Sequence, residues 1–295
     1  MPGVTILGVP TSAGSHNPGQ EKAPAAWRAA GLAEALAKAG LDVKDAGDAV
    51  NATPFGPMEP VGGLRDLDRV VTVASAVAER VAAIRAAGRL PLVLGGDCTI
   101  SLGAMAGFGR GGLVYFDGDA DLSTPDNTGS AVADTMGMAH LLGGGSPRLA
   151  RLGSRYPLVA DDEVVLFGFD PGELDTAQWT ELASRHLYAA PAPAVRAGPA
   201  AAAAAARAYL AGRVDSYLVH FDVDVLHTGL FPLANYPHFA GLTLDEVRAC
   251  LAEFAAGDGF GGLVVTEVNP NNDPSGELLR SLVGVVAGAL APGGR

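Results

Sequence analysis

Aspartates stand at alternate positions in two short segments of this chain. The segment FDGDAD carries Asp117, Asp119 and Asp121, and the segment FDVD carries Asp222 and Asp224. Side chains two residues apart in an extended segment point to the same side, so each set can converge on one point. Crowded carboxylates raise one another's pKa, and protons or cations must therefore neutralise them. Hard divalent cations such as Mn²⁺ or Mg²⁺ bind carboxylate oxygens, and two ions bridged by shared aspartates are a recurrent hydrolytic arrangement.

Two further motifs carry candidate residues. GGDC places Cys98 after one apolar run, and TEVNP places Glu267 after another. The alternative roles are structural, because aspartates often cap helices and turns and a free cysteine is often a buried thiol that packs under a site. Since the acidic pattern occurs on two separate segments, the metal interpretation is favoured over capping.

Short apolar runs rich in β-branched residues carry or precede all four motifs. Such runs predict strands at 4–9, 41–47, 90–96, 113–119, 163–169, 216–224 and 262–268. Apolar residues spaced three and four apart predict amphipathic helices at 24–40, 65–88, 175–186 and 242–257. This alternation predicts an α/β fold around a parallel sheet. Ligands of such sheets bind outside the carboxyl ends of the strands, where the motifs stand.

A low-complexity stretch covers 189–213. Its first prolines predict irregular structure, followed by an alanine-rich helix with Pro199 in its first turn. A domain boundary is less favoured here, because a predicted strand follows directly and the alternation resumes. We therefore expect a single domain over residues 1–295.

Composition excludes several classes of partner. The 32 acidic and 20 basic residues give a net charge of −12, which repels nucleic acid and anionic membranes. Two cysteines, Cys98 and Cys250, do not make a disulfide framework, and this fits a reducing cytosol. The sequence shows neither a leader pattern nor the roughly 20 apolar residues that span a bilayer. We expect a cytoplasmic protein without a membrane or nucleic-acid partner.

The four motifs together resemble those of the arginase/agmatinase, or ureohydrolase, family, and the resemblance covers nearly the whole chain. GGDCTISLG resembles the GGDH segment, DGDADLSTPDNTGS resembles D-A-H-x-D-x-N-T-P-x-x-x-x-S, FDVDVL resembles the DVD motif, and EVNPNNDPSG resembles the closing E-x-N-P. The resemblance implies a three-layer α/β/α fold with a central, mostly parallel sheet. It also implies a homo-oligomer, a trimer or a hexamer.

The family hydrolyses a guanidinium group with a hydroxide held by Mn²⁺ ions and releases urea. By position, the resemblance implies that the metal ligands are Cys98, Asp117, Asp119, Asp121, Asp222 and Asp224. Glu267 would hold the guanidinium group of the substrate, while Ser123 and Ser130 would meet the other end of the substrate. One or two Mn²⁺ ions are the expected cofactor.

Several positions depart from the family pattern. Cys98 and Asp119 stand where the family has histidines, so the ligand set is more anionic, and a softer ion such as Zn²⁺ becomes conceivable at Cys98. A proton-shuttling histidine of the family is also missing, and Asp134 could replace it or meet a differently charged substrate. A remodelled pocket wall could be lined by His227, Tyr236, His238 and Phe239, although a structural role is the alternative for each. The two histidines of this set could bind substrate.

Three functions follow from these observations. The first is a metal-dependent amidinohydrolase, a C–N hydrolase acting on a modified arginine or another guanidino compound. The second is a catalytically impaired homologue that serves as a binding or regulatory subunit. The third is a metal-dependent hydrolase of a formimino or ureido C–N bond.

Overall fold

One sheet of eight parallel strands forms the centre of the molecule in the computed structural model, which describes residues 3–52, 55–56 and 59–292. The strand order is β2-β1-β3-β8-β7-β4-β5-β6. The strands are β1 (Val4–Gly8), β2 (Val43–Asp48), β3 (Leu90–Leu94), β4 (Gly112–Phe116), β5 (Val164–Phe167), β6 (Tyr188–Ala190), β7 (Tyr217–Asp222) and β8 (Phe260–Thr266). All seven predicted strands are present, and the edge strand β6 was not predicted.

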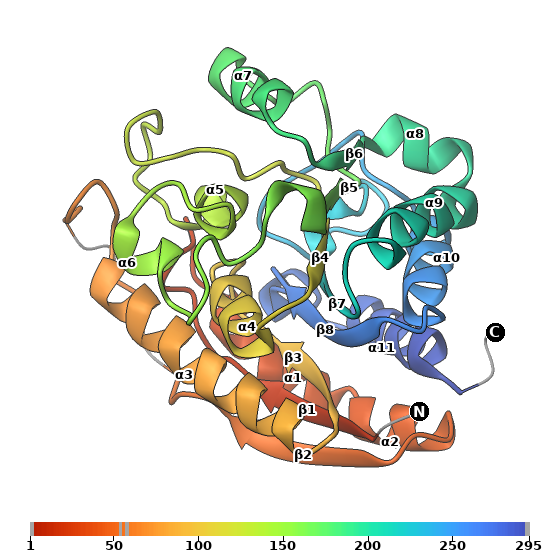
Figure 1. The fold of residues 1–295 in the computed structure, drawn as a ribbon. Helices are drawn as coiled ribbons and strands as arrows, with labels where there is room; N and C mark the ends of the chain where they lie inside the picture. The colour runs from red at the N-terminus through yellow and green to blue at the C-terminus, as the bar shows by residue number, and fades with distance from the viewer. Residues whose placement is uncertain (1–2, 53–54, 57–58, 293–295) are drawn as a thin grey trace.

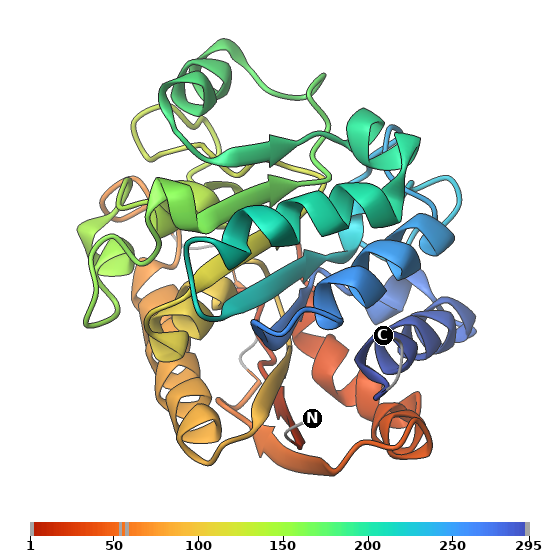
Figure 2. The ribbon, with the colours of Figure 1, turned by 45° about the vertical axis from the view of Figure 1, so that its right-hand side comes forward.

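Helices cover both faces of this sheet, which confirms the predicted three-layer α/β/α fold (Figures 1 and 2). One face carries α3 (Leu67–Ala86), α4 (Ile100–Phe108), α5 (Gly137–Leu141) and α6 (Pro147–Ala150). The other carries α1 (Ala23–Ala29), α2 (Leu32–Lys38), α8 (Ala192–Ala197), α9 (Pro199–Ala211), α10 (Leu244–Ala255) and α11 (Glu277–Leu290). Helix α7 (Thr176–Ser184) lies at the top of Figure 1 and contributes Leu182 to the core on the α3 and α4 face.

Short 3₁₀ helices connect several of these elements. They are η1 (Gln20–Lys22), η2 (Asp134–Met136), η3 (Asp161–Glu163), η4 (Val223–Val225) and η5 (Pro270–Asn272). Among the described residues, no helix combines the length and the apolar character that crossing a bilayer requires.

The helix predictions are correct in place but wrong in some details. The predicted helix 24–40 is two helices, because Gly31 adopts a φ of 80° between α1 and α2. Prolines do not keep 191–197 irregular: Pro193 lies in the first turn of α8, where proline is tolerated. Helices α4 and α11 were not predicted.

The strands separate two apolar cores, and their side chains alternate between them. On β7, Val219 and Phe221 join the core beneath α9, α10 and α11, whereas Leu218 joins the core beneath α3 and α4. His220, two residues after Leu218, therefore points toward α4. This alternation decides which side chains of the strand ends can meet.

Candidate metal centre

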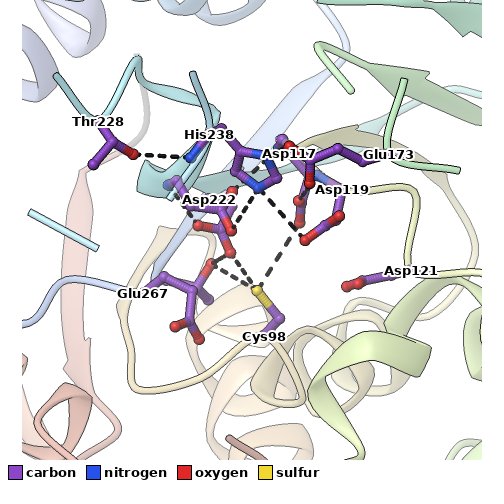
Figure 3. Close-up of polar contacts among 12 residues, drawn as sticks. Cys98, Asp117, Asp119, Asp121, Glu173, Asp222, Thr228, His238 and Glu267 are labelled. Carbon is purple, nitrogen blue, oxygen red and sulfur yellow. Dashed lines mark hydrogen bonds and ion pairs between the residues drawn. The ribbon is translucent and has the colours of Figure 1, made fainter. Parts of the chain in front are cut away.

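The four predicted motifs meet at the carboxyl ends of four consecutive strands of the sheet, β3, β8, β7 and β4. Asp117 directly follows β4, Asp222 ends β7, and Glu267 directly follows β8. Cys98 lies in the segment that leads from β3 into α4. Residues that are up to 169 positions apart in the sequence therefore come together in space, as Figure 3 shows.

The Cys98 thiol lies at the base of the cluster. Its Sγ contacts Oδ2 of Asp222 and donates to Oγ1 of Thr266 at 3.3 Å. Oδ2 of Asp117 lies 4.0 Å from the same sulfur. The residues Cys98, Asp117 and Asp222 are each at most 3% exposed. Burial, and then the charge of Asp222, raise the pKa of the thiol well above its ordinary value.

An imidazole that the sequence prediction missed completes this group. Nε2 of His220 lies 3.1 Å from Oδ2 of Asp117 and 3.8 Å from Sγ of Cys98. Ser101 of α4 lies 2.7 Å from its Nδ1, and the Tyr115 ring stacks on it with centroids 4.2 Å apart. Burial lowers the pKa of His220 to about 3, so the ring is neutral. The first donor group is therefore Cys98, Asp117, His220 and Asp222.

A second donor group lies beside the first and joins Asp119, Asp224 and His238. Nε2 of His238 lies 3.5 Å from Asp119 and 3.6 Å from Asp224, while Nδ1 lies 3.1 Å from Oε1 of Glu173. Burial opposes the charged form, but Asp224 and Asp119 outweigh it and raise the pKa of His238 to about 12. His238 was predicted as a substrate-binding residue, and the structure places it against two predicted metal ligands.

Two carboxylates at the cavity have backbones in the left-handed region. Asp121 has a φ of 49° and Glu267 a φ of 63°, a conformation that strains a residue with a side chain. Tyr115 donates a hydrogen bond of 2.5 Å to Asp121. Gln20 donates a hydrogen bond of 2.7 Å to Oε2 of Glu267. The other carboxylate oxygen of Glu267, Oε1, is buried and has no hydrogen-bond partner among the described residues. Such strain is typical of functional sites.

Asp134, predicted as a catalytic residue, also reaches the cluster. It lies in η2 and accepts a hydrogen bond of 2.7 Å from the backbone N–H of Cys98. Asp134, Cys98 and Glu267 offer atoms within 4.8 Å of one another. Met136, which precedes the glycine of this loop, is instead buried in the core beneath α3 and α4. Asp134 and the adjacent Thr135 thus face the site, whereas Met136 does not.

A cavity of about 240 Å³ opens above the cluster. The predicted substrate-binding residues Ser123 and Ser130 line it, and so does Tyr236, which was expected at the pocket wall. Five further lining residues were not assigned to the site from the sequence: His16, Thr128, Thr135, Glu173 and Gln178. No lysine or arginine is among the described residues that line the cavity. His227 lies elsewhere, with its ring edge-on to Phe239, and its assignment to substrate binding stays a prediction.

The electrostatics of the cluster favour a cation. Burial raises the pKa of Asp117, Asp222 and Asp121 well above the ordinary range, and neighbouring aspartates raise it further. Burial and the charge of Asp134 do the same for Glu267. Carboxylates held this close are neutralised by protons or by cations, and deprotonated carboxylates bind divalent ions.

Comparison with known proteins agrees with the fold and with the motifs. A model of the arginase family matches residues 2–290. The arginase of Bacillus caldovelox is 29% identical over 282 residues, which cover 92% of this chain and 92% of that protein. Human arginase-1 is 29% identical over 303 residues, covering 98% and 92%. A solved structure of the B. caldovelox arginase has a TM-score of 0.92 at 28% identity and covers 99% of both chains. The predicted family resemblance is confirmed.

Proposed function

The chain belongs to the arginase family, and on this premise we propose that it is a metal-dependent hydrolase of the C–N bond in a guanidine-containing small molecule. The observation that carries the proposal is the junction of two donor groups with the unpartnered oxygen of Glu267 at one cavity. The substrate we propose is a modified arginine or another guanidino compound.

The donor chemistry fits divalent cations. Cys98, Asp117, His220 and Asp222 would hold one ion, and Asp119 and Asp224 would contribute to a second. Asp121 would join Cys98 at the first ion, as the family resemblance implies. Mn²⁺ suits the carboxylates, whereas the thiol and the imidazole also suit Zn²⁺. When bound, such ions supply a water that is activated for attack at neutral pH.

Glu267 is the residue that we propose to bind the guanidinium group. Its Oε2 is occupied by Gln20, so Oε1 remains to accept an N–H of a cation. A guanidinium group presents N–H donors in a planar fork that suits a carboxylate. The cavity, which has no lysine or arginine among its described lining residues, favours a cationic substrate.

Two further groups of the chain have proposed roles in the reaction. Asp134 lies beside Cys98 and Glu267 and would exchange a proton with the reacting nitrogen, in the manner of a general acid or base. The hydroxyl groups of Ser123, Thr128 and Ser130 would meet the polar tail of the substrate at the cavity wall. We also propose a trimer or a hexamer, as the family resemblance implies.

The test measures urea release from a panel of guanidines after the purified protein is loaded with Mn²⁺. The panel contains arginine, N-hydroxylated and N-methylated arginines, and agmatine. We expect urea from at least one modified guanidine and none from metal-stripped protein or from Asp222→Asn. Metal bound without urea from any member would favour hydrolysis of a formimino or ureido bond. Absence of bound metal after loading would favour a binding or regulatory subunit.

A further inference from the structure

We propose that His238 is a ligand of the second cation, together with Asp119 and Asp224, and that Glu173 orients its ring. The inference deepens the proposed function, on which it rests, and names a ligand that lies outside the four sequence motifs. His238 belongs to the segment between β7 and α10, which approaches the cluster from the side (Figure 3).

The state of Nε2 is the first observation that supports this role. His238 is fully buried, yet Nε2 makes no hydrogen bond to any described residue. It faces carboxylate oxygens of Asp119 and Asp224 at 3.5 and 3.6 Å. Two donors that each lie about 2.1 Å from a tetrahedral zinc ion are roughly 3.4 Å apart, so these separations leave room for a shared ion. A buried nitrogen that faces two carboxylates without a hydrogen bond to either of them is what such a ligand requires.

The other side of the ring is fixed in the manner of metal-binding histidines. Nδ1 lies 3.1 Å from Oε1 of Glu173, and the backbone N–H of His238 donates to Oγ1 of Thr228 at 2.8 Å. A carboxylate on the second ring nitrogen keeps the proton on Nδ1, so a cation that displaces the other proton meets the electron pair of Nε2. Glu173 is therefore a positioning residue that acts through His238.

Gly118 shows that the ring occupies a place reserved for it. A Cβ at position 118 would lie 2.6 Å from Cδ2 and 2.8 Å from Nε2 of His238, closer than atoms in contact can approach. The φ of Gly118 is not positive, so its backbone does not require glycine. The missing side chain therefore serves the approach of the ring to the strand end.

The test titrates metal-stripped protein with Mn²⁺ and measures ion number and affinity by isothermal calorimetry and by the electron paramagnetic resonance signal of free Mn²⁺. We expect two ions in the wild type. His238→Ala and His238→Gln should each lower the Mn²⁺ affinity of the second site by at least about 10-fold. Glu173→Gln should lower the affinity of the same site to a similar extent. His186→Ala, which removes an exposed imidazole just after α7, should bind as the wild type does.

Gly118→Ala provides a variant that replaces none of the proposed ligands but places a methyl group against His238, and 3.0 Å from Oδ1 of Asp224. It should displace His238 and weaken the second site while the first site keeps its affinity, and the retained first site shows that the variant is folded. Nitrogen hyperfine coupling to bound Mn²⁺ should decrease in His238→Gln.

Three outcomes would overturn the inference. The first is a second site that keeps its affinity in both His238 variants, and the second is wild-type protein that binds fewer than two ions. The third is tighter binding in the variants, because it would identify His238 as a counterion that competes with the metal. If the protein releases urea and its Mn²⁺ affinity is the same in the His238 variants as in the wild type, this inference is refuted and the proposed function is retained. Two ions bound through His238 without urea release would do the reverse.

Discussion

The imidazole of His220 on β7 lies 3.1 Å from the carboxylate of Asp117, which directly follows the neighbouring strand β4. Ser101 fixes the opposite nitrogen, and burial holds the ring neutral by lowering its pKa to about 3. A neutral ring with one nitrogen facing a carboxylate and a thiol is a donor for a metal ion.

We therefore expect His220→Asn to weaken metal binding at the first site. Removing a ligand or the partner that orients it lowers metal affinity by roughly 10- to 100-fold. Competition with a chelator measures this loss. His140→Asn is the matched control, because His140 is equally buried but bonds Met136 and Ser146 away from the cluster. An affinity equal to that of the control would remove His220 from the ligand set.

Cys98 should decide which metal the first site prefers. A thiolate binds soft ions and an imidazole is more permissive, so Cys98→Ser should lose Cd²⁺ and Zn²⁺ affinity more than Mn²⁺ affinity. Cys98→His should shift the preference toward Mn²⁺. The ultraviolet charge-transfer band of a Cd²⁺-loaded protein reports the thiolate bond directly. The band should persist in Cys250→Ser, because the Cys250 thiol lies on α10 and donates to Pro199; a band that persists in Cys98→Ser contradicts the assignment.

Glu267→Gln should separate substrate binding from metal binding. Losing a charged partner of the guanidinium group reduces the free energy of transition-state stabilisation by about 1.5 to 3 kcal/mol. The kcat/KM for urea release should therefore fall by roughly 10- to 100-fold. Metal content should stay unchanged, because Glu267 is not placed among the proposed ligands. Glu181→Gln, on α7 and paired with Arg185, is the control. Equal rates in the two variants would exclude a role for Glu267 in binding the substrate.

Stability should depend on pH in a direction that the cluster sets. Burial raises the pKa of Asp117 and Asp222 above the unfolded value of about 4, so the native state holds more protons and loses stability as pH rises. His238, with a pKa raised to about 12, acts in the same direction above its unfolded value of about 6.5. Burial lowers the pKa of His140 to about 4 and that of His220 to about 3, so these histidines make stability rise with pH. Their effect is confined to pH values below the unfolded pKa of about 6.5.

Between pH 7 and 9 the free energy of unfolding of the metal-free protein should therefore fall. The slope is about 1.4 kcal/mol per pH unit for each excess proton in the native state. Saturating Mn²⁺ should displace these protons, raise the stability and flatten the slope. Urea unfolding at several pH values, with and without Mn²⁺, measures both effects. Metal-free stability that rises across this range would contradict the raised pKa values.

Sequence reasoning located the strand ends because each motif is local. Asp117 and Asp222 follow apolar runs that form strands, and parallel strands bring their carboxyl ends to one edge. The same rule contained a signal for His220, which precedes Asp222 by two residues and so shares its side of β7. The histidine was missed because a single histidine within an apolar run is typical of a buried core residue.

Other features were outside the reach of local patterns. His238 and Glu173 come from two connecting segments whose paths depend on tertiary packing, and neither spacing nor periodicity relates them to Asp119. Asp134 was selected from the sequence for its carboxylate, but the direction of its side chain could not be predicted, because it depends on the turn of η2. Helix α4 was missed because its residues are apolar all round, which removes the amphipathic pattern.

The position of β8 in the sheet has a consequence for how the protein is made. This strand is formed near the end of the chain but lies between β3 and β7. Until it emerges from the ribosome, the two halves of the sheet have unpaired inner edges and cannot join. A chain shortened before residue 260 would present those edges to other molecules and would lack a complete metal site. We infer that cation uptake follows the synthesis of β8, and that a nascent chain that has not reached this strand relies on rapid elongation or on chaperones to avoid aggregation.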